Sequence, residues 1–355
     1  MKIIHTSDLH IGSPLTSVLP KEKVRTRRNE LFEAFYRMTE EASMIGAVAF
    51  IIAGDLFDCE NVSGRDIERT LSIIERKNDI TFLYLPGNHE GEVLASRGNL
   101  PKNLFVFGKE WSYIDIGEVT FFGRSETGSN MFDGLKLDRE RINIAVLHGT
   151  LTDRSREGGF IGKTDASEKG IDYIALGHYH SFSHEKLDNR TVAVYSGVPE
   201  GRGFDELGEC GYVEIDASFG KLDYTFKPSS KRRILEIPCD ITGLDTQNDI
   251  LKASREVLAK ANGSDIVRLV ITGEHSPELY ADTDMLTISL ERDFFHFEVR
   301  DSSRLVINAE DYKYDRSLKG EFIRLILSKD ELTDTQRDKT IRLGLNALMG
   351  DIGEV

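Results

Sequence analysis

Five short apolar segments in this sequence each run directly into a turn that is rich in glycine, histidine, asparagine or aspartate. The second segment is an almost unbroken apolar run, which is typical of a strand buried on both faces. A sixth segment, TVAVYSG (191–197), ends in a turn with fewer such side chains. The five segments are MKIIHTSD (1–8), AVAFIIAGD (47–55), ITFLYLPGNH (80–89), INIAVLHG (142–149) and IDYIALGHYH (171–180).

Helical patterns fill some of the gaps between these strands. In 27–45, and again in 66–77, apolar residues recur at every third or fourth position, as on one face of an amphipathic helix. Alternating strands and helices predict an α/β layered fold. The segments 113–123 and 211–226 instead indicate hairpins with glycine in their turns. We therefore expect a mixed sheet, or two packed sheets, rather than purely parallel winding.

The length of 355 residues exceeds what one hydrophobic core usually spans, so two domains are expected. The polar stretch KPSSKRR (227–233) suggests the boundary. We predict a first domain over 1–228 and a smaller α+β accessory or capping domain over 229–355. For the second domain we expect a helix at 247–262, strands at 265–273, 284–291 and 294–308, and helices at 317–328 and 332–349.

Several classes of protein are disfavoured by the composition. No apolar run approaches the ~20 residues of a membrane helix, and the first residues do not resemble a signal peptide. The three cysteines are scattered, which fits a reducing cytoplasm and argues against thiolate metal sites. A formal net charge of −15 argues against nucleic-acid binding. Two basic runs, 21–28 and 231–233, are interpreted as solvated faces or linkers.

The turns after the five strands carry the candidate functional residues. Taken alone, the Asp8-x-His10 pair is typical of a capped turn. Turns at the same ends of the strands in a layered α/β fold converge in space, however, so distant residues can form one pocket. The candidates are Asp8 and His10, then Asp55 and Asp58, then Asn88, His89 and Glu90, then His148, and last His178 and His180.

The chemistry of these side chains indicates metal binding. Carboxylate oxygens and imidazole nitrogens without thiolates suit Mn²⁺, Fe or Zn²⁺. Seven candidate ligands are too many for one ion with an open position, but they fit two ions that share a bridging carboxylate. Glycines beside the ligands, such as Gly54 and Gly177, allow the backbone to turn sharply and approach closely.

The order DLH, GDLFD, GNHE, LHG and GHYH resembles the signature of the calcineurin-like metallophosphoesterases, over roughly the first two thirds of the chain. The resemblance implies a two-sheet sandwich flanked by helices, with a dinuclear site at one edge. It implies that His89 is not a ligand but meets the leaving group or a phosphate oxygen, and that Asp58 orients it. In the implied ligand set Asp55 bridges the two metals, one of which is held by Asp8, His10 and His180 and the other by Asn88, His148 and His178.

Two further segments narrow the resemblance. IHTSDLHIGSPL (4–15) and the stretch at 194–216 look like parts of SbcD-type exonucleases, and the C-terminal region looks like the YhaO-type branch. This implies a manganese-dependent DNA exonuclease or endonuclease that acts in DNA repair with an SbcC-like coiled-coil ATPase. SbcD-like relatives also form homodimers, although no residue pattern in this chain demands it.

Two other functions stay open from the sequence. A phosphatase or phosphodiesterase that acts on nucleotides or other small phosphoesters would suit the acidic composition. A binding or scaffold subunit with an idle site is the third hypothesis, which the full set of ligand-type residues disfavours.

Overall fold

The computed structural model describes residues 1–15, 19–58, 62–87, 94, 99–154, 156, 158–218, 220–276, 279, 281–306 and 312–349. The chain forms two compact units, Met1–Ile234 and Leu235–Val355. The boundary after residue 228 and the accessory role of the second domain stay predictions.

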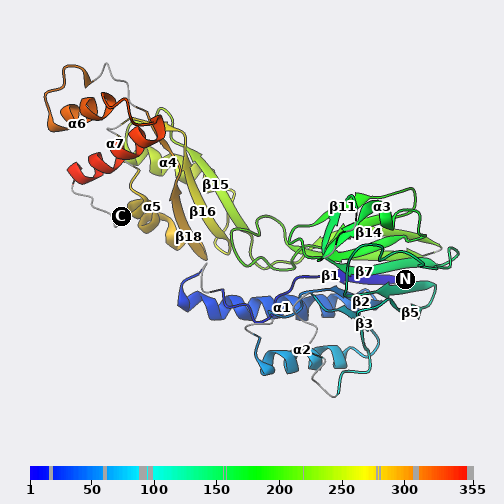
Figure 1. Ribbon diagram of the computed structural model, residues 1–355. Coiled ribbons are helices and arrows are strands. Elements are labelled where there is room, and N and C mark those ends of the chain that lie inside the picture. Colours follow the sequence, from blue (N-terminus) through cyan, green and yellow to red (C-terminus); the bar gives the residue numbers. More distant parts are fainter. Residues whose placement is uncertain are drawn as a thin grey trace. The chain divides into compact units, whose positions relative to one another are not determined.

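One six-stranded sheet of the first unit contains the N-terminal strand (Figure 1). Strands β1 to β4 pair in parallel, and β13 and β14 form an antiparallel hairpin at one edge, as predicted for 211–226. The sheet order is β14 (Lys221–Pro228), β13 (Gly211–Ser218), β1 (Lys2–Thr6), β2 (Ala47–Ala53), β3 (Thr81–Leu85) and β4 (Leu104–Val106).

The second six-stranded sheet is also mixed. Its central strands β6, β7, β10 and β12 are parallel, and the edge strands β5 and β11 are antiparallel to their neighbours. The short strands β8 (Thr150–Thr152) and β9 (Phe160–Gly162) and the helix α3 (Lys163–Ala166) follow β7. The sheet order is β11 (Ser183–Lys186), β12 (Val192–Tyr195), β10 (Tyr173–Gly177), β7 (Ile142–His148), β6 (Val119–Gly123) and β5 (Ser112–Ile116).

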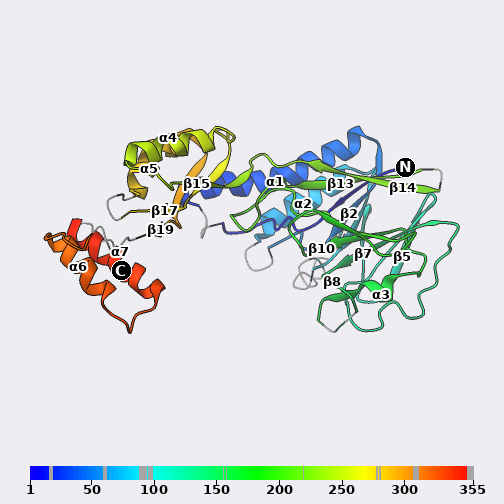
Figure 2. The same cartoon turned by 90° about the horizontal axis from the view of Figure 1, so that it is seen from above.

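The two sheets pack face to face, and helices cover the outer face of the first sheet (Figures 1 and 2). Ile51 and Leu83 of the first sheet share one core with Ile144 of the second. On the other face of the first sheet, α1 (Lys21–Met44) and α2 (Gly64–Arg76) bury a second core, where Phe35 contacts Phe50 edge-on. The predicted α/β fold of two packed sheets flanked by helices is therefore confirmed.

A buried network of ion pairs begins in the first basic run, so its interpretation as a solvated face was wrong for Arg27. The Arg27 guanidinium is fully buried and donates to the carboxylates of Glu30 and Glu200, the latter at 2.9 Å. Arg232, from the second basic run, donates to Glu30 at 2.8 Å. The periodic pattern of apolar residues could not reveal this, because a buried cation needs partners that are distant in sequence.

The second unit contains a sheet in the order β15 (Ile234–Asp240), β16 (Ile266–Thr272) and β18 (His296–Asp301), and β16 and β18 are parallel. Helix α4 (Gln247–Leu258) and the C-terminal helices α6 (Leu318–Leu327) and α7 (Asp334–Met349) lie close to the predicted ranges. The remaining elements are β17 (Glu274–His275), β19 (Arg304–Leu305), α5 (Thr283–Leu290) and the 3-10 turn Glu291–Asp293.

The strand predicted at 284–291 was wrong, because this segment forms the helix α5. The Asp282 carboxylate caps the helix by accepting from the Met285 N–H at 2.8 Å. Leu286 and Leu290, four residues apart, are both buried. The β-branched residues Thr287 and Ile288 favoured a strand, but Ile288 is largely exposed in the structure. The cap and the buried leucines outweigh local β-propensity here.

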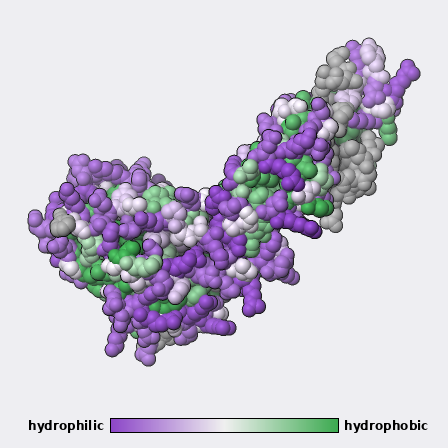
Figure 3. All heavy atoms as spheres, turned by 180° about the vertical axis from the view of Figure 1, so that it is seen from behind, coloured by the Kyte–Doolittle hydropathy of each residue, from purple (hydrophilic) through white to green (hydrophobic). Residues whose placement is uncertain are grey.

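Among the residues that the structure describes, none of the helices is both long and apolar enough to cross a membrane. The face of the molecule seen in Figure 3 is largely hydrophilic, with hydrophobic side chains scattered between the polar ones.

The buried network around Arg27 leads to a stability prediction. Replacing Arg27 with methionine leaves Glu30 and Glu200 as poorly compensated buried charges, and we expect the free energy of unfolding to fall by about 3–5 kcal/mol. Urea unfolding measures this change. The matched control Arg25→Met, at an exposed position of the same helix, should stay within about 0.5 kcal/mol of the wild type. Equal losses in the two variants would contradict a stabilising role for the network.

Candidate metal centre

The predicted ligands lie in turns at the carboxyl ends of four central strands. Strands β1 and β2 are parallel neighbours in one sheet, and β7 and β10 are parallel neighbours in the other. The pairing of β1 with β2 continues beyond both strands. The Asp8 N–H donates to the Gly54 carbonyl at 3.0 Å, and the His10 N–H donates to the Asp55 carbonyl at 2.9 Å. These two bonds hold Asp8 and His10 beside Asp55.

The backbone at these turns is strained at the positions of the candidate ligands themselves. Asp8 has a φ of 53°, His10 of 44°, Asp55 of 50° and His178 of 104°. Residues with a Cβ rarely adopt positive φ, and such conformations persist only where the surrounding structure holds them. The strain is therefore concentrated where the side chains converge, which is a common property of functional sites.

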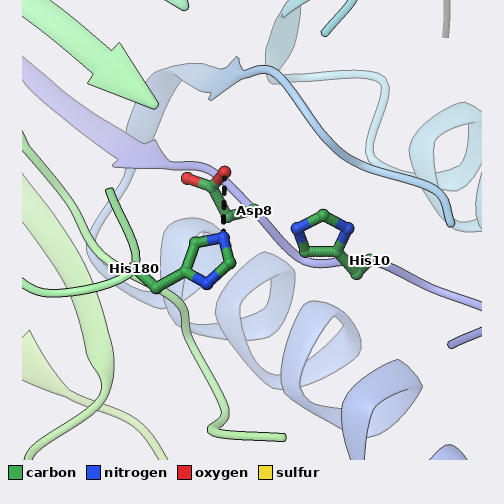
Figure 4. Close-up of side chains that lie close together, drawn as sticks. All are labelled: Asp8, His10 and His180. Atoms are coloured by element: carbon green, nitrogen blue, oxygen red, sulfur yellow. Dashed lines mark ion pairs between the residues drawn. The ribbon is translucent and has the colours of Figure 1, made fainter. Parts of the chain in front are cut away.

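One group of potential metal ligands consists of Asp8, His10 and His180, whose ligand atoms lie within 4.8 Å of one another. Figure 4 shows Asp8 and His10 in the segment that follows β1, with His180 approaching from the second sheet. The His180 Nε2 is 3.8 Å from the Asp8 Oδ1. A carboxylate and two imidazoles at this spacing can share one divalent ion.

A second group consists of Asp8, Asp55 and His148. The Asp55 Oδ2 is 3.5 Å from the His148 Nε2 and 3.8 Å from the His10 Nε2. The same oxygen therefore lies between a histidine of the first group and a histidine of the second. This is where a carboxylate that bridges two ions would have to lie.

The other predicted site residues are placed as follows. His178 is exposed and belongs to neither group, although its ring centroid is 5.5 Å from that of His148. Asp58 is half-buried, and its N–H donates to the Ile11 carbonyl at 2.9 Å. Asn88, His89 and Glu90 lie outside the described residues. Their described neighbour Gly87 contacts the site closely, because a Cβ built on it would be 1.9 Å from the Asp55 Oδ1.

Hydrogen bonds from surrounding groups orient the candidate ligands. The His148 Nδ1 donates to the Ala53 carbonyl at 2.9 Å, which leaves the Nε2 lone pair facing Asp55. The Asp8 carboxylate accepts from the Ser7 hydroxyl and from the His178 N–H, the latter at 3.0 Å. These contacts fix both side chains before any ion binds.

Glu206 was not among the predicted site residues, yet it supports His180 directly. The His180 Nδ1 is 2.8 Å from the Glu206 Oε1, so this bond directs the Nε2 toward Asp8. Arg202 donates to the same carboxylate and lies 3.3 Å from the His180 Nδ1. Both residues fall in the 194–216 stretch, and its resemblance to SbcD-type exonucleases was the only signal that could have pointed to them.

The electrostatic environment affects the protonation of the histidines. Burial, reinforced by the nearby Arg202, lowers the pKa of His10 to about 4. Burial also lowers the pKa of His178. The hydrogen bond to Glu206 raises the pKa of His180. His10 is therefore neutral near pH 7, with a lone pair available for a cation.

The residues present fit divalent metal ions. The His10 Nε2 is buried and has no hydrogen-bond partner among the described residues, so this nitrogen is desolvated without compensation. Burial raises the pKa of the Asp8 carboxyl, which shows how costly its negative charge is without a nearby cation. A divalent ion beside Asp8 and His10 would compensate both groups. The donor atoms are oxygen and nitrogen, as predicted.

Comparison with known proteins gives matches over the same region. A family model described as calcineurin-like phosphoesterase matches residues 1–182. The chain is 27% identical over 300 residues to the metallophosphoesterase YhaO of Bacillus subtilis strain 168, a match that covers 77% of this chain and 72% of YhaO. It is 26% identical over 308 residues to the DNA double-strand break repair protein Mre11 of Methanopyrus kandleri, covering 74% of this chain and 66% of Mre11. Among solved structures, a dimetal phosphatase from Danio rerio has a TM-score of 0.43 and 8% identity, covering 64% of this chain and 96% of that chain.

The close approach of Gly54 to His148 can be tested by mutation. In Gly54→Ala the new Cβ would be 2.0 Å from the His148 Nδ1, so His148 has to move and lose its bond to Ala53. We expect metal analysis of the purified variant to show fewer bound ions than in the wild type. The control Gly46→Ala also has positive φ, but nothing lies within 4 Å of its Cβ, so it should lose only about 1–2 kcal/mol of stability and keep its metal. Full metal content in Gly54→Ala would contradict the role given to His148.

The support that Glu206 gives to His180 leads to a second prediction. Glu206→Gln removes the charged acceptor of the His180 N–H, and we expect the affinity for one of two bound Mn²⁺ ions to fall about 10–100-fold. Isothermal titration calorimetry resolves the two binding events. Glu209→Gln, at an exposed position three residues further on, is the matched control and should bind like the wild type. Equal weakening of both ions would show a general structural defect instead.

Proposed function

Because the chain belongs to the calcineurin-like phosphoesterase family, we propose that it is a DNA nuclease that hydrolyses phosphodiester bonds at a dinuclear metal centre. The observation that carries the dinuclear part is the position of the Asp55 Oδ2 between His10 and His148. One carboxylate oxygen that faces histidines of two ligand groups is the arrangement that a pair of ions requires.

In this proposal the chain holds two ions through the predicted ligand set. Asp55 bridges them, and both ions are manganese, although iron and zinc suit the same donors. Two bound divalent ions supply an activated water as nucleophile and neutralise the charge of the phosphate oxygens. One ion is held by Asp8, His10 and His180, and the other by Asn88, His148 and His178.

The protein side chains contribute positioning and proton transfer. The bonds from Ser7 and from the His178 N–H fix the Asp8 carboxylate, and Glu206 fixes the ring of His180. Burial keeps His10 neutral, so it does not have to lose a proton before it binds a cation. We assign His89 as the general acid that protonates the leaving oxygen, with Asp58 as the residue that orients it.

The proposal that the phosphodiester belongs to DNA is supported by the relatives. Mre11 of Methanopyrus kandleri is named as a DNA double-strand break repair protein, and its match spans most of this chain. We extend the proposal to a coiled-coil ATPase of the SbcC kind as partner and to a homodimer. A phosphatase or phosphodiesterase for small phosphoesters is the second candidate, which the net charge of −15 favours.

One assay separates the two candidate functions. Protein loaded with Mn²⁺ is given labelled single-stranded and duplex DNA, and in parallel bis-p-nitrophenyl phosphate, and hydrolysis of both classes of substrate is expected. Asp55→Asn should lose more than the about 10–100-fold that removal of a supporting hydrogen bond typically causes, and both ions should bind more weakly. Asp133→Asn, at an exposed position, is the control.

Two outcomes would contradict these proposals. Hydrolysis of the small ester without cleavage of any DNA, even after a coiled-coil ATPase partner is added, would assign the chain to small phosphoesters. Normal turnover of Asp55→Asn with two bound ions would refute the bridging role of Asp55.

A further inference from the structure

A groove of about 530 Å³ lies between the N-terminal parts of α1 and α2, and basic side chains dominate its lining. We call it the basic groove and define it by Lys21, Arg25 and Arg28 of α1 and Arg65 and Arg69 of α2. Figure 1 shows these two helices on the same side of the first sheet. The volume is in the range typical of ligand-binding pockets, about 300–1,000 Å³.

The positive charge of the basic groove is not neutralised from within. Asp66 is the single carboxylate among its lining residues, and it is engaged at the start of α2, where it accepts from the Ser63 hydroxyl at 2.7 Å. Lys21, Arg25 and Arg65 are exposed, and among the described residues no carboxylate lies within ion-pairing distance of them. A concentration of cations in a chain of net charge −15 indicates an anionic ligand.

The basic groove begins at the loop that leaves the candidate metal centre. Ile11 and Gly12, the first residues after His10, line it. Arg28 donates to the Ser13 carbonyl at 2.9 Å, so α1 is tied directly to this loop. Gly12 is packed so closely that a Cβ on it would be 2.7 Å from the Val62 Cα, just before α2. A chain-like ligand could therefore pass from the metal centre into the groove without interruption.

We propose that the basic groove binds the sugar-phosphate backbone of the polynucleotide whose phosphodiester lies at the metal centre, an inference that rests on the proposed nuclease function. Guanidinium groups match the geometry of phosphate oxygens and donate two parallel hydrogen bonds to them. Cations at successive turns of two helices suit an extended ligand with several phosphates better than a single small anion.

The groove is built to contact the backbone rather than the bases. Phe32 is the aromatic residue in its lining, and the Arg69 guanidinium covers its ring at 3.6 Å from the centroid. A base therefore cannot stack on this ring without displacing Arg69. Contacts to phosphates carry no sequence information directly, so binding through the groove is independent of sequence.

Binding measurements with a charge-neutralised variant test this inference. The variant Lys21→Gln/Arg25→Gln/Arg65→Gln removes three exposed cations, and its partner control Lys102→Gln/Lys136→Gln/Lys221→Gln removes three exposed cations outside the groove. Binding of a fluorescently labelled single-stranded oligonucleotide is measured by anisotropy in a chelator, where it is not cut. Since each lost contact removes about 0.7 from the slope of log K against log salt, the groove variant should lose about 2 from that slope and bind about 100-fold more weakly at ~0.1 M salt.

The same variants separate the groove from the metal centre. With Mn²⁺ present, the groove variant should hydrolyse bis-p-nitrophenyl phosphate at the wild-type rate and DNA far more slowly, while the control resembles the wild type on both. Equal salt slopes for the groove variant and the control would overturn the inference and leave the nuclease proposal intact. If the wild type neither binds nor cuts any polynucleotide, the nuclease proposal fails and takes the inference with it. Loss of binding to phosphatidylserine vesicles with unchanged oligonucleotide binding would assign the groove to lipid and would also overturn the inference.

Discussion

Two backbone hydrogen bonds hold together the turns from which the candidate metal centre is built. They join Asp8 to Gly54 and His10 to Asp55, one step beyond the last residues of β1 and β2. Both acceptor carbonyls and both donors belong to turns with positive φ, and each such residue costs on the order of 1–3 kcal/mol. The parallel ladder of β1 and β2 and the buried cores on both faces of the sheet supply the stability that keeps these turns in place.

The parts of the structure that could be predicted from sequence are those with a local signal. A strand buried on both faces is apolar throughout, and a ligand at its end follows at once, so Asp8, His10, Asp55, His148 and His180 could be located before the fold was known. Interactions between distant segments left no such signal. The support of His180 by Glu206, and the buried ion pairs of Arg27 with Glu200, depend on chain segments that meet only in the folded protein.

Local signals also misled where two of them competed. In α5 the β-branched residues indicated a strand, while the Asp282 cap and the spacing of Leu286 and Leu290 favoured a helix. The net charge misled in a similar way, because a sum over 355 residues says nothing about where the charges lie. Lys21, Arg25 and Arg65 face one groove, and the acidic majority is distributed over other surfaces. Total charge governs solubility and long-range attraction, whereas a ligand responds to the field within a Debye length of about 10 Å.

The packing of the two sheets has a consequence for how such a protein can evolve. His148 stands on the second sheet but donates to Ala53 of the first, and a Cβ on Gly177 would be 1.9 Å from the same Ala53 carbonyl. The separation of the sheets at this end is thus set by backbone contact, with no room for a methyl group. Because Asp8 and Asp55 belong to one sheet and His148 and His180 to the other, the thickness of the core between the sheets also sets the size of the ion cage. Substitutions among residues such as Ile51, Leu83 and Ile144, far from any reacting atom, would be selected for their effect on the spacing of the ligands as much as for stability. The hydrophobic core would then drift more slowly in sequence than that of a sandwich without metals, and its volume would act as the calliper of the catalytic centre.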